Sequence, residues 1–414
     1  MLAKLFKSRG RIRALRNGPA GSLLERFAQT LSEKGYTRDT VRIYLRGAGH
    51  FIYWTHRQGM PVCKLNEQSL TQFRRHLSRC RCPHYAHEDQ LSIVRGARLF
   101  LTYLRDARIV TPPPIKPSLH DPTLLSAFCR WMHQQRNTCD ATLKRYSVYI
   151  RVLLRRFGEE PSRLDARRLR AFILERSHCG RTAAKMCTTA LRMFLRFLIA
   201  EGQCAVGLDA AIPTLAHWRL ASLPRYLQPE EVERLIASCD RASVGGRRDR
   251  AILLLLARLG LRAGDIMNLR LSDIDWKDAS VSVCGKGHRS TRLPLTQEVG
   301  QAIVAYLKKG RPGTNVDILF LHCRAPYCTF RSPAAVSHIV DRALRRAGVV
   351  RPSPGAAHLL RHSLATSLLR QGTSLQEIAS ILRHRSIETT QIYAKVDFPA
   401  LRQIAQPWPE VQSC

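Results

Sequence analysis

Several polar residues in the C-terminal half of the chain have unusual neighbours. Arg262 directly follows a long apolar run, and Lys286 lies between two glycines, although the chain has only 12 lysines against 55 arginines. His358 and Arg361 are three residues apart, so a helix would place them on one face. Two guanidiniums, from Arg262 and Arg361, could clamp the anionic oxygens of a phosphodiester and stabilise the charge of its transition state.

A nucleophile and its proton partners can be found in the same part of the chain. Tyr393 has an ordinary pKa of about 10 and needs a base, for which His358 is the candidate. Lys286 is the candidate acid for the leaving 5′-oxygen, and His384 would hydrogen-bond the scissile phosphate. This chemistry would yield a covalent 3′-phosphotyrosine and would require neither metal nor cofactor.

The order of these residues resembles the tyrosine recombinase family, also called the phage integrase family. The resemblance to its catalytic domain covers roughly residues 225–400, and 120–205 resembles its core-binding helical bundle. It implies a site-specific recombinase or integrase acting on double-stranded DNA, for a mobile element. The matching motifs, in chain order, are Leu261-Arg262, Gly285-Lys286-Gly287, His358 to His362, His384 and Tyr393.

Two positions depart from the family pattern. Asp265 stands where the family commonly has Glu, and Arg383 stands where Gly usually precedes the histidine at 384. Neither change removes a catalytic group. The shorter carboxylate makes support of Arg262 less certain, and the arginine is expected to alter the turn before His384.

Composition limits the class of partner. The chain has 414 residues and a formal net charge of +36, which favours nucleic acid as the partner. The sequence contains no apolar run of about 18 residues, the length that could span a membrane. Thirteen scattered cysteines do not form a disulfide framework, which favours a reducing cytoplasm. For a DNA-binding chain of this kind we expect a prokaryotic cytoplasm and association with the nucleoid.

One group of potential metal ligands lies in the first hundred residues. Cys80, Cys82, His84 and His87 fall within eight residues. Structural zinc sites usually draw on two separated pairs, so four ligands this close fit one tetrahedral ion poorly. We therefore predict no metal site from the sequence, although the pattern leaves the question open.

The predicted fold is mainly α-helical with a small β-sheet. The expected parts are a basic N-terminal arm or solvated tail, two SAM-like helical bundles, a mixed α+β catalytic domain and a C-terminal tail. Their boundaries are 1–19, 20–112, 118–212, 224–400 and 401–414.

The two bundles look like copies. Phe27 precedes Thr37 and Tyr44 much as Phe128 precedes Thr138 and Tyr146, and a threonine is expected to cap a helix in each copy.

Exposed arginines in these bundles are the predicted contacts with DNA phosphates. Helical spacing is expected to place each trio of bundle arginines on one face, and two more arginines flank the hairpin of the catalytic domain. The eight residues are Arg38, Arg42, Arg46, Arg163, Arg167, Arg170, Arg289 and Arg292.

The catalytic domain should begin with a helix at Pro229, continue with a buried helix over 248–259, and contain a hairpin whose tip is 285–288. Two other functions stay open: DNA relaxation by a type IB topoisomerase, which shares the tyrosine chemistry, and DNA binding by a non-catalytic accessory protein whose site has decayed. Recombination would need a homotetramer on two DNA sites, alone or with related recombinases. Apolar residues of the tail (Phe398, Leu401, Ile404 and Trp408) could dock on a neighbouring protomer or on their own domain.

Overall fold

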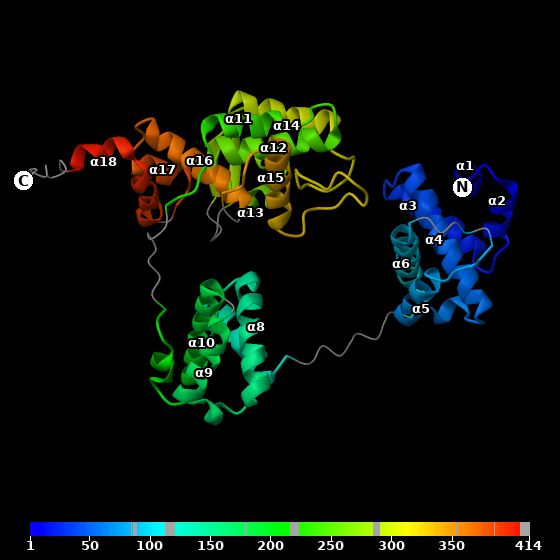
Figure 1. Cartoon of the computed structure of the whole chain (residues 1–414), viewed down its shortest axis with the longest axis horizontal. Coiled ribbons are helices and arrows are strands. Elements are labelled where there is room, and N and C mark those ends of the chain that lie inside the picture. Colours follow the sequence, from blue (N-terminus) through cyan, green and yellow to red (C-terminus); the bar gives the residue numbers. More distant parts are fainter. Residues whose placement is uncertain are drawn as a thin grey trace, which may run out of the picture. The chain divides into compact units, whose positions relative to one another are not determined.

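The structure is a computed structural model that describes residues 1–83, 85, 89–111, 121–178, 180–215, 223–284, 290–352, 355–384 and 386–405. Over these residues the fold is mainly helical with one small sheet, as predicted (Figure 1). The chain divides into two compact units, Met1–Ala107 with Leu220–Cys414, and Arg108–Arg219. The boundaries of the five-part division made from the sequence stay a prediction. Within the described ranges, no helix combines the length and apolarity that a membrane crossing requires.

The N-terminal helices pack around the pair α4 and α6. Gly47 of α4 faces the backbone of Ile93, and Gly96 of α6 faces the backbone of Tyr44. A Cβ at either glycine would lie 2.4 Å from a carbonyl oxygen of the other helix, so only glycine permits this close crossing. The elements are α1 Leu2–Leu5, α2 Arg9–Arg16, α3 Gly21–Glu33, α4 Arg38–Arg57, η1 Val62–Lys64, α5 Glu67–Leu77 and α6 Gln90–Asp106.

The first residues do not form the arm or solvated tail expected for 1–19. Leu2, Leu5 and Leu15 are buried, and α1 and α2 pack on α4 and α3. The Met1 ammonium also lies 3.0 Å from the Glu25 carboxylate. The high content of basic residues favoured the prediction of an arm or tail. The few apolar side chains among them are nevertheless enough to hold two short helices on the bundle.

The second group of helices has its own aromatic core. Phe128 meets Phe194 edge to face at 5.5 Å, and both are fully buried. A threonine caps α4, where Thr37 accepts from the Thr40 amide, but α8 begins after Cys139 without a side-chain cap. The predicted threonine cap is therefore right only in the first bundle. The elements are α7 Thr123–Arg136, α8 Asp140–Phe157, η2 Pro161–Arg163, α9 Ala166–Ser177, α10 Arg181–Ala200 and η3 Leu208–Ala211.

The C-terminal helices surround α12, whose apolar run from Ala251 to Ala257 is buried. Helix α11 begins at Pro229, as predicted, and Gln228 and Glu231 form a capping box at its start. The helices are α11 Pro229–Ala237, α12 Val244–Arg258, α13 Ala263–Asn268, α14 Gln297–Lys309, α15 Ala334–Arg346, α16 Ala356–Arg370, α17 Leu375–Ile381, η4 Ile387–Thr389, η5 Gln391–Val396 and α18 Phe398–Ile404.

One antiparallel sheet of order β1-β2-β3 lies between α13 and α14 in the chain. Its strands are β1 Ile274–Asp275, β2 Ser280–Cys284 and β3 Ser290–Pro294. Val281 pairs with Leu293, so both point into the core, as alternation predicts. The tip that joins β2 to β3, including Lys286, lies outside the described residues.

Candidate active site

Arg361 is the buried centre of the candidate site. It lies on α16, is only 4% exposed, and donates to the carbonyl oxygens of Gly260 and Leu382. Gly260 has φ +57°, and a Cβ there would lie 2.7 Å from Leu382, so this close approach needs glycine. Burial and the neighbouring Arg262 and Arg383 lower the pKa of Arg361 to about 10. The guanidinium remains charged at neutral pH and is held rigidly.

Arg262 caps the start of α13 beside this centre. Its backbone N–H donates to the Asp265 carboxylate at 2.9 Å, and its guanidinium donates to the carbonyl of Arg383 at 3.2 Å. Burial, which outweighs the attraction of Asp265, lowers the pKa of Arg262. Asp265 thus orders the residue through its backbone, so the shorter carboxylate still supports Arg262.

Arg383 adds a third guanidinium to the site. Its Nη2 lies 2.6 Å from Asp265 Oδ2, and its backbone has φ +54°, a conformation that favours glycine. This backbone explains why a glycine suits the position, and the ion pair with Asp265 offsets the strain. Nε and Nη1 of Arg383 are buried and have no hydrogen-bond partner among the described residues.

Tyr393 lies in η5, with its ring in a small apolar cluster that includes Leu369 and Leu382. The side chain is 1% exposed, and its hydroxyl is 2.8 Å from Nδ1 of His362. Burial raises the pKa of Tyr393 to about 12, although nearby Arg361 opposes the shift. Burial, with the charges around it, lowers the pKa of His362 to about 4, so this imidazole is neutral and its Nδ1 can accept a hydrogen bond from the hydroxyl.

His384 lies between Arg383 and η5. Its Nδ1 is 2.7 Å from Oγ1 of the fully buried Thr390. Burial, followed by the charges of Arg361 and Arg262, lowers the pKa of His384 to about 4. The hydrogen bond orients the ring and leaves the other ring nitrogen for a substrate.

His358 lies one turn before His362 on α16 and is exposed. Desolvation by the surrounding protein, and then the charges of Arg361 and Arg262, lower its pKa. The structure therefore brings together five of the six residues predicted to be catalytic. The sixth, Lys286, lies outside the described residues.

Two contacts in the site were not predicted from the sequence. His362 was part of the quoted motif, but the partner expected for the nucleophile was His358 and not its neighbour one turn later. Spacing could have suggested it, because His358 and His362 are four residues apart and occupy the same helix face. Thr390 gave no signal, since its partner depends on how η4 and η5 fold back.

The predicted DNA-contact residues of α4 lie at the surface in part. Arg38 and Arg46 are exposed, whereas Arg42 is half-buried and pairs with Asp39 at 3.1 Å. Helical spacing does place the three on one side of α4. Their contact with DNA stays a prediction.

The second trio does not share one helix face, contrary to the prediction. Arg163 belongs to η2 and pairs with Glu160 at 2.6 Å, while exposed Arg167 and Arg170 belong to α9. The chain breaks between them because Asp165 caps the start of α9. Helical spacing was applied across this break.

Arg292 of β3 is held within its own sheet. Its guanidinium lies 2.6 Å from Asp275 and 2.8 Å from Asp278, and it also donates to Ser280. These ion pairs weigh against the predicted contact with the DNA backbone. Arg289 lies outside the described residues.

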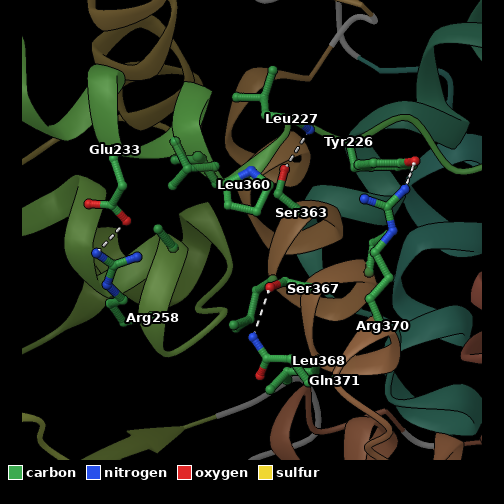
Figure 2. Close-up of a pocket in the computed structure, with 15 residues that line it drawn as sticks. Tyr226, Leu227, Glu233, Arg258, Leu360, Ser363, Ser367, Leu368, Arg370 and Gln371 are labelled. Carbon is green, nitrogen blue, oxygen red and sulfur yellow. Dashed lines mark hydrogen bonds and ion pairs between the residues drawn. The ribbon is translucent and has the colours of Figure 1, made fainter.

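A pocket opens on another side of α16 (Figure 2). Ser363 accepts from the Leu227 amide at 2.8 Å, and Arg370 donates to the Tyr226 hydroxyl at 2.5 Å. None of the predicted catalytic residues lines this pocket. It therefore belongs to the packing of α11 on α16, and the chemistry lies elsewhere.

The chain matches the model of the phage integrase family over residues 225–399. It is 35% identical to an integrase/recombinase of Sinorhizobium fredii, y4rA, over 95% of both chains, and 30% identical to tyrosine recombinase XerD of Yersinia pestis over 69% of this chain and 97% of that one.

Among solved structures, the XerH site-specific recombinase bound to a palindromic difH substrate shares the fold. The TM-score is 0.54 at 18% identity, over 81% of this chain and 93% of that one. A tetramer of lambda integrase bound to a Holliday junction gives 0.52 at 18% identity, over 79% and 91%. These structures show the shared fold, while the family model and the relative that matches 95% of both chains show that the chain belongs to the phage integrase family of tyrosine recombinases, enzymes of site-specific DNA recombination.

Proposed function

We propose that Tyr393 is the nucleophile that joins this recombinase to double-stranded DNA, and that Arg262, Arg361, His384, His358 and Lys286 complete its site. The observation that carries the proposal is the contact of the Tyr393 hydroxyl with Nδ1 of His362, 2.8 Å away. Among the described residues around it, three guanidiniums, of Arg262, Arg361 and Arg383, stand against one carboxylate, that of Asp265. A phosphodiester supplies the anion that this arrangement lacks.

The cleavage step is assigned from these contacts, and Lys286, which lies outside the described residues, takes the role that the family motif implies. The Tyr393 oxygen attacks the scissile phosphorus while its proton passes to neutral His362, which already touches the hydroxyl. The bond from phosphorus to the 5′-oxygen breaks, and Lys286 protonates that oxygen. Arg262 and Arg361 hold the non-bridging oxygens, with His384 donating beside them. His362 therefore takes the role of base that was predicted for His358. His358, which is exposed one turn before His362, would contact the phosphate.

The product is a 3′-phosphotyrosine and a free 5′-hydroxyl. The 5′-hydroxyl of a second strand can attack the phosphorus of this product. The bond from phosphorus to the tyrosine oxygen then breaks, which releases Tyr393 and joins the strands. No hydrolysis or external energy source enters this balance. Strand exchange thus needs two duplexes held together.

The hydroxyl of Tyr393 must become accessible before it can attack. At 1% exposure, its ring is covered by the apolar cluster that includes Leu369 and Leu382. We expect DNA binding to move η5 relative to α16. Fluorescence or hydrogen exchange of η5 with and without a DNA site would detect the movement.

We extend the proposal to assembly as a homotetramer on two DNA sites, alone or with related recombinases, in a prokaryotic cytoplasm. Helix α18 supports an intermolecular contact, because Leu401 and Ile404 are exposed. The Phe398 side chain and Trp408 lie outside the described residues. Deleting 398–414 should reduce cooperative pairing of sites in a gel assay, whereas unchanged pairing would exclude this docking.

A nicked suicide DNA substrate tests the nucleophile. The wild-type chain should form an adduct that survives denaturation, and Tyr393→Phe should abolish it. Tyr226→Phe is the matched control, since its hydroxyl lies in the pocket of Figure 2. An adduct that persists in Tyr393→Phe, or no wild-type adduct, contradicts the proposal. Plasmid relaxation without joining of paired sites would favour the topoisomerase alternative.

A further inference from the structure

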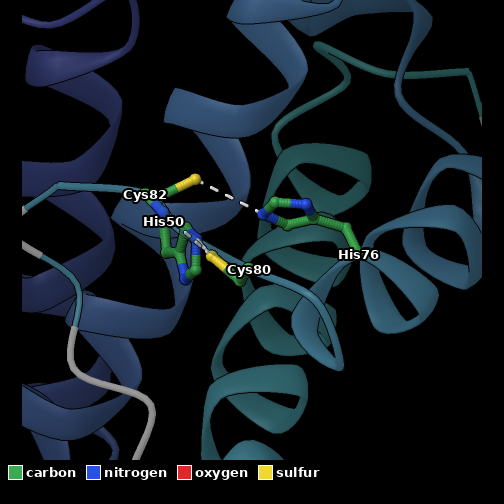
Figure 3. A group of neighbouring side chains, drawn as sticks. All are labelled: His50, His76, Cys80 and Cys82. Carbon is green, nitrogen blue, oxygen red and sulfur yellow. Dashed lines mark hydrogen bonds between the residues drawn. The ribbon is translucent and has the colours of Figure 1, made fainter.

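A second polar cluster lies far along the sequence from this site, among the N-terminal helices (Figure 3). His50 Nε2 is 3.4 Å from Cys80 Sγ, and His76 Nε2 is 3.3 Å from Cys82 Sγ. The four ligand atoms all lie within 4.8 Å of one another. Figure 3 shows the four side chains grouped together, with Cys82 joined to His76 and Cys80 joined to His50.

These distances suit a tetrahedral ion. With Zn–N near 2.0 Å and Zn–S near 2.3 Å, nitrogen and sulfur ligands of one zinc lie about 3.5 Å apart, and two sulfurs about 3.8 Å apart. The two N···S distances in the structure, 3.4 and 3.3 Å, are close to the first value. The remaining separations, at most 4.8 Å, need only small side-chain rotations.

The surrounding structure holds the imidazoles in place. His50 of α4 is 1% exposed and stacks on Tyr85 at 4.3 Å, while His76 of α5 stacks on Trp54 at 5.5 Å. Phe73 contacts both histidine rings. Ligands that are fixed before the ion arrives lose little entropy when they bind it.

The ligand set corrects the assumption behind the sequence prediction. Grouping by proximity joined Cys80 and Cys82 to His84 and His87, which lie outside the described residues. The fold instead supplies His50 from α4 and His76 from α5, so the cysteine pair meets two histidines from other elements. This is the division between separated ligands that structural zinc sites use.

We propose that His50, His76, Cys80 and Cys82 bind a structural Zn²⁺ ion. Two thiolates and two neutral imidazoles make a neutral complex with the ion, so the buried site carries no net charge. The ion would join α4, α5 and the segment after α5. That segment leads to α6, and α6 makes the close crossing with α4 at Gly47 and Gly96. We infer that zinc holds the bundle in the shape that presents the arginines of α4.

The experiment uses the full-length protein purified without added chelator. Elemental analysis should find about one zinc per chain. Replacement by Co²⁺ should give the visible absorption of a tetrahedral complex and thiolate-to-cobalt charge transfer in the near ultraviolet. A zinc-free wild-type chain that also fails to bind Co²⁺ overturns the proposal without any variant.

Variants then locate the ion. Cys80→Ser with Cys82→Ser, and His50→Gln with His76→Gln, should each lose zinc and the cobalt spectrum. The matched control is Cys63→Ser with His56→Ala, because both residues are exposed and belong to the same bundle. Full zinc content in either ligand pair, or loss of zinc in the control, would reject the assignment. Retention in His84→Ala with His87→Ala separates this site from the one that proximity suggested.

A thiol assay distinguishes zinc-bound thiolates from free thiols and from a disulfide between Cys80 and Cys82. Zinc should slow the alkylation of Cys80 and Cys82 at least tenfold relative to the metal-free chain, in which these buried and half-buried thiols already react slowly. Cys63 serves as the internal reference. Equal reactivity with and without zinc would overturn the proposal, as would recovery of Cys80 and Cys82 as an oxidised pair under reducing purification.

Discussion

The active-site cluster and the His-Cys cluster are both buried groups of polar side chains. The first lacks an anion, and the second lacks a cation. The first brings Arg262, Arg361 and Arg383 together against Asp265. The second brings two imidazoles and two thiols together. Burying polar groups is unfavourable unless each finds a partner, so an unfinished cluster indicates the ligand that completes it.

The clusters differ in how they meet this cost. In the active site the guanidiniums are held by backbone carbonyls of Gly260, Leu382 and Arg383, and part of Arg383 has no partner among the described residues. In the N-terminal cluster the members hydrogen-bond one another. A site for a transient substrate keeps polar atoms without hydrogen-bond partners until the substrate binds. In a site for a resident ion, the ligands can hydrogen-bond one another before the ion binds.

The largest effect is expected at Arg361. Arg361→Lys keeps the charge but cannot donate to two carbonyls and a phosphate at once. Cleavage of the nicked substrate should slow by roughly 10²–10³-fold. Arg370→Lys on the same helix should cleave like the wild type, because its partner is Tyr226. A wild-type rate in Arg361→Lys would separate this residue from the anion site.

A slightly smaller loss is expected at His362. Removing the side chain in His362→Ala takes away the neutral partner of the Tyr393 hydroxyl, so adduct formation should slow by roughly 10²-fold. DNA affinity should stay the same, which separates an effect on chemistry from one on binding. His338→Ala in α15 is the control. If His358→Ala alone shows the defect, the proton goes to His358.

Ions should act on one cluster and not on the other. Inorganic phosphate at a hundredfold excess over its Kd should stabilise the C-terminal helices by about 2.7 kcal/mol, because it supplies the missing anion. Urea unfolding followed by hydrogen exchange would assign the effect to α13, α16 and η5. A zinc chelator should destabilise α4–α6 and leave this response intact. Equal effects of both reagents on both regions would break the comparison.

Acid should destabilise the active site through His384. Its pKa is about 4 in the folded chain against an ordinary 6.5, so the unfolded chain binds more protons below pH 6.5. Stability is therefore full above pH 6.5 and falls as the pH drops toward 4. Between pH 7 and pH 5 the loss should be about 1 kcal/mol, after allowance for solvent screening. Urea titrations of wild type and His384→Gln should differ by this amount.

The smallest effect is expected in the backbone of Arg383. Arg383→Ala and Arg383→Gly both delete the ion pair with Asp265, but only alanine keeps a side chain at φ +54°. The glycine variant should be more stable by about 0.5–1 kcal/mol in urea unfolding. An alanine variant as stable as the glycine variant would mean that the turn relaxes.

The sequence by itself determined the family, the mainly helical class and the order of the motif residues. Local rules were enough for these features: Pro229 begins α11, alternating residues make β2 and β3, and an apolar run makes the buried α12. Such signals act between neighbours in the chain, so they can be read without knowledge of the fold.

Only the tertiary structure decided which side chains meet. His362 contacts Tyr393 across 31 residues, Asp265 pairs with Arg383 across 118, and Cys80 meets His50 across 30. It also decided that Leu2, Leu5 and Leu15 pack on the bundle in place of a free arm. These contacts depend on how helices cross, and residue spacing carries no information on the crossing. The sequence therefore indicated the kind of chemistry. The packing of segments that are distant in the chain decided which atoms take part in it.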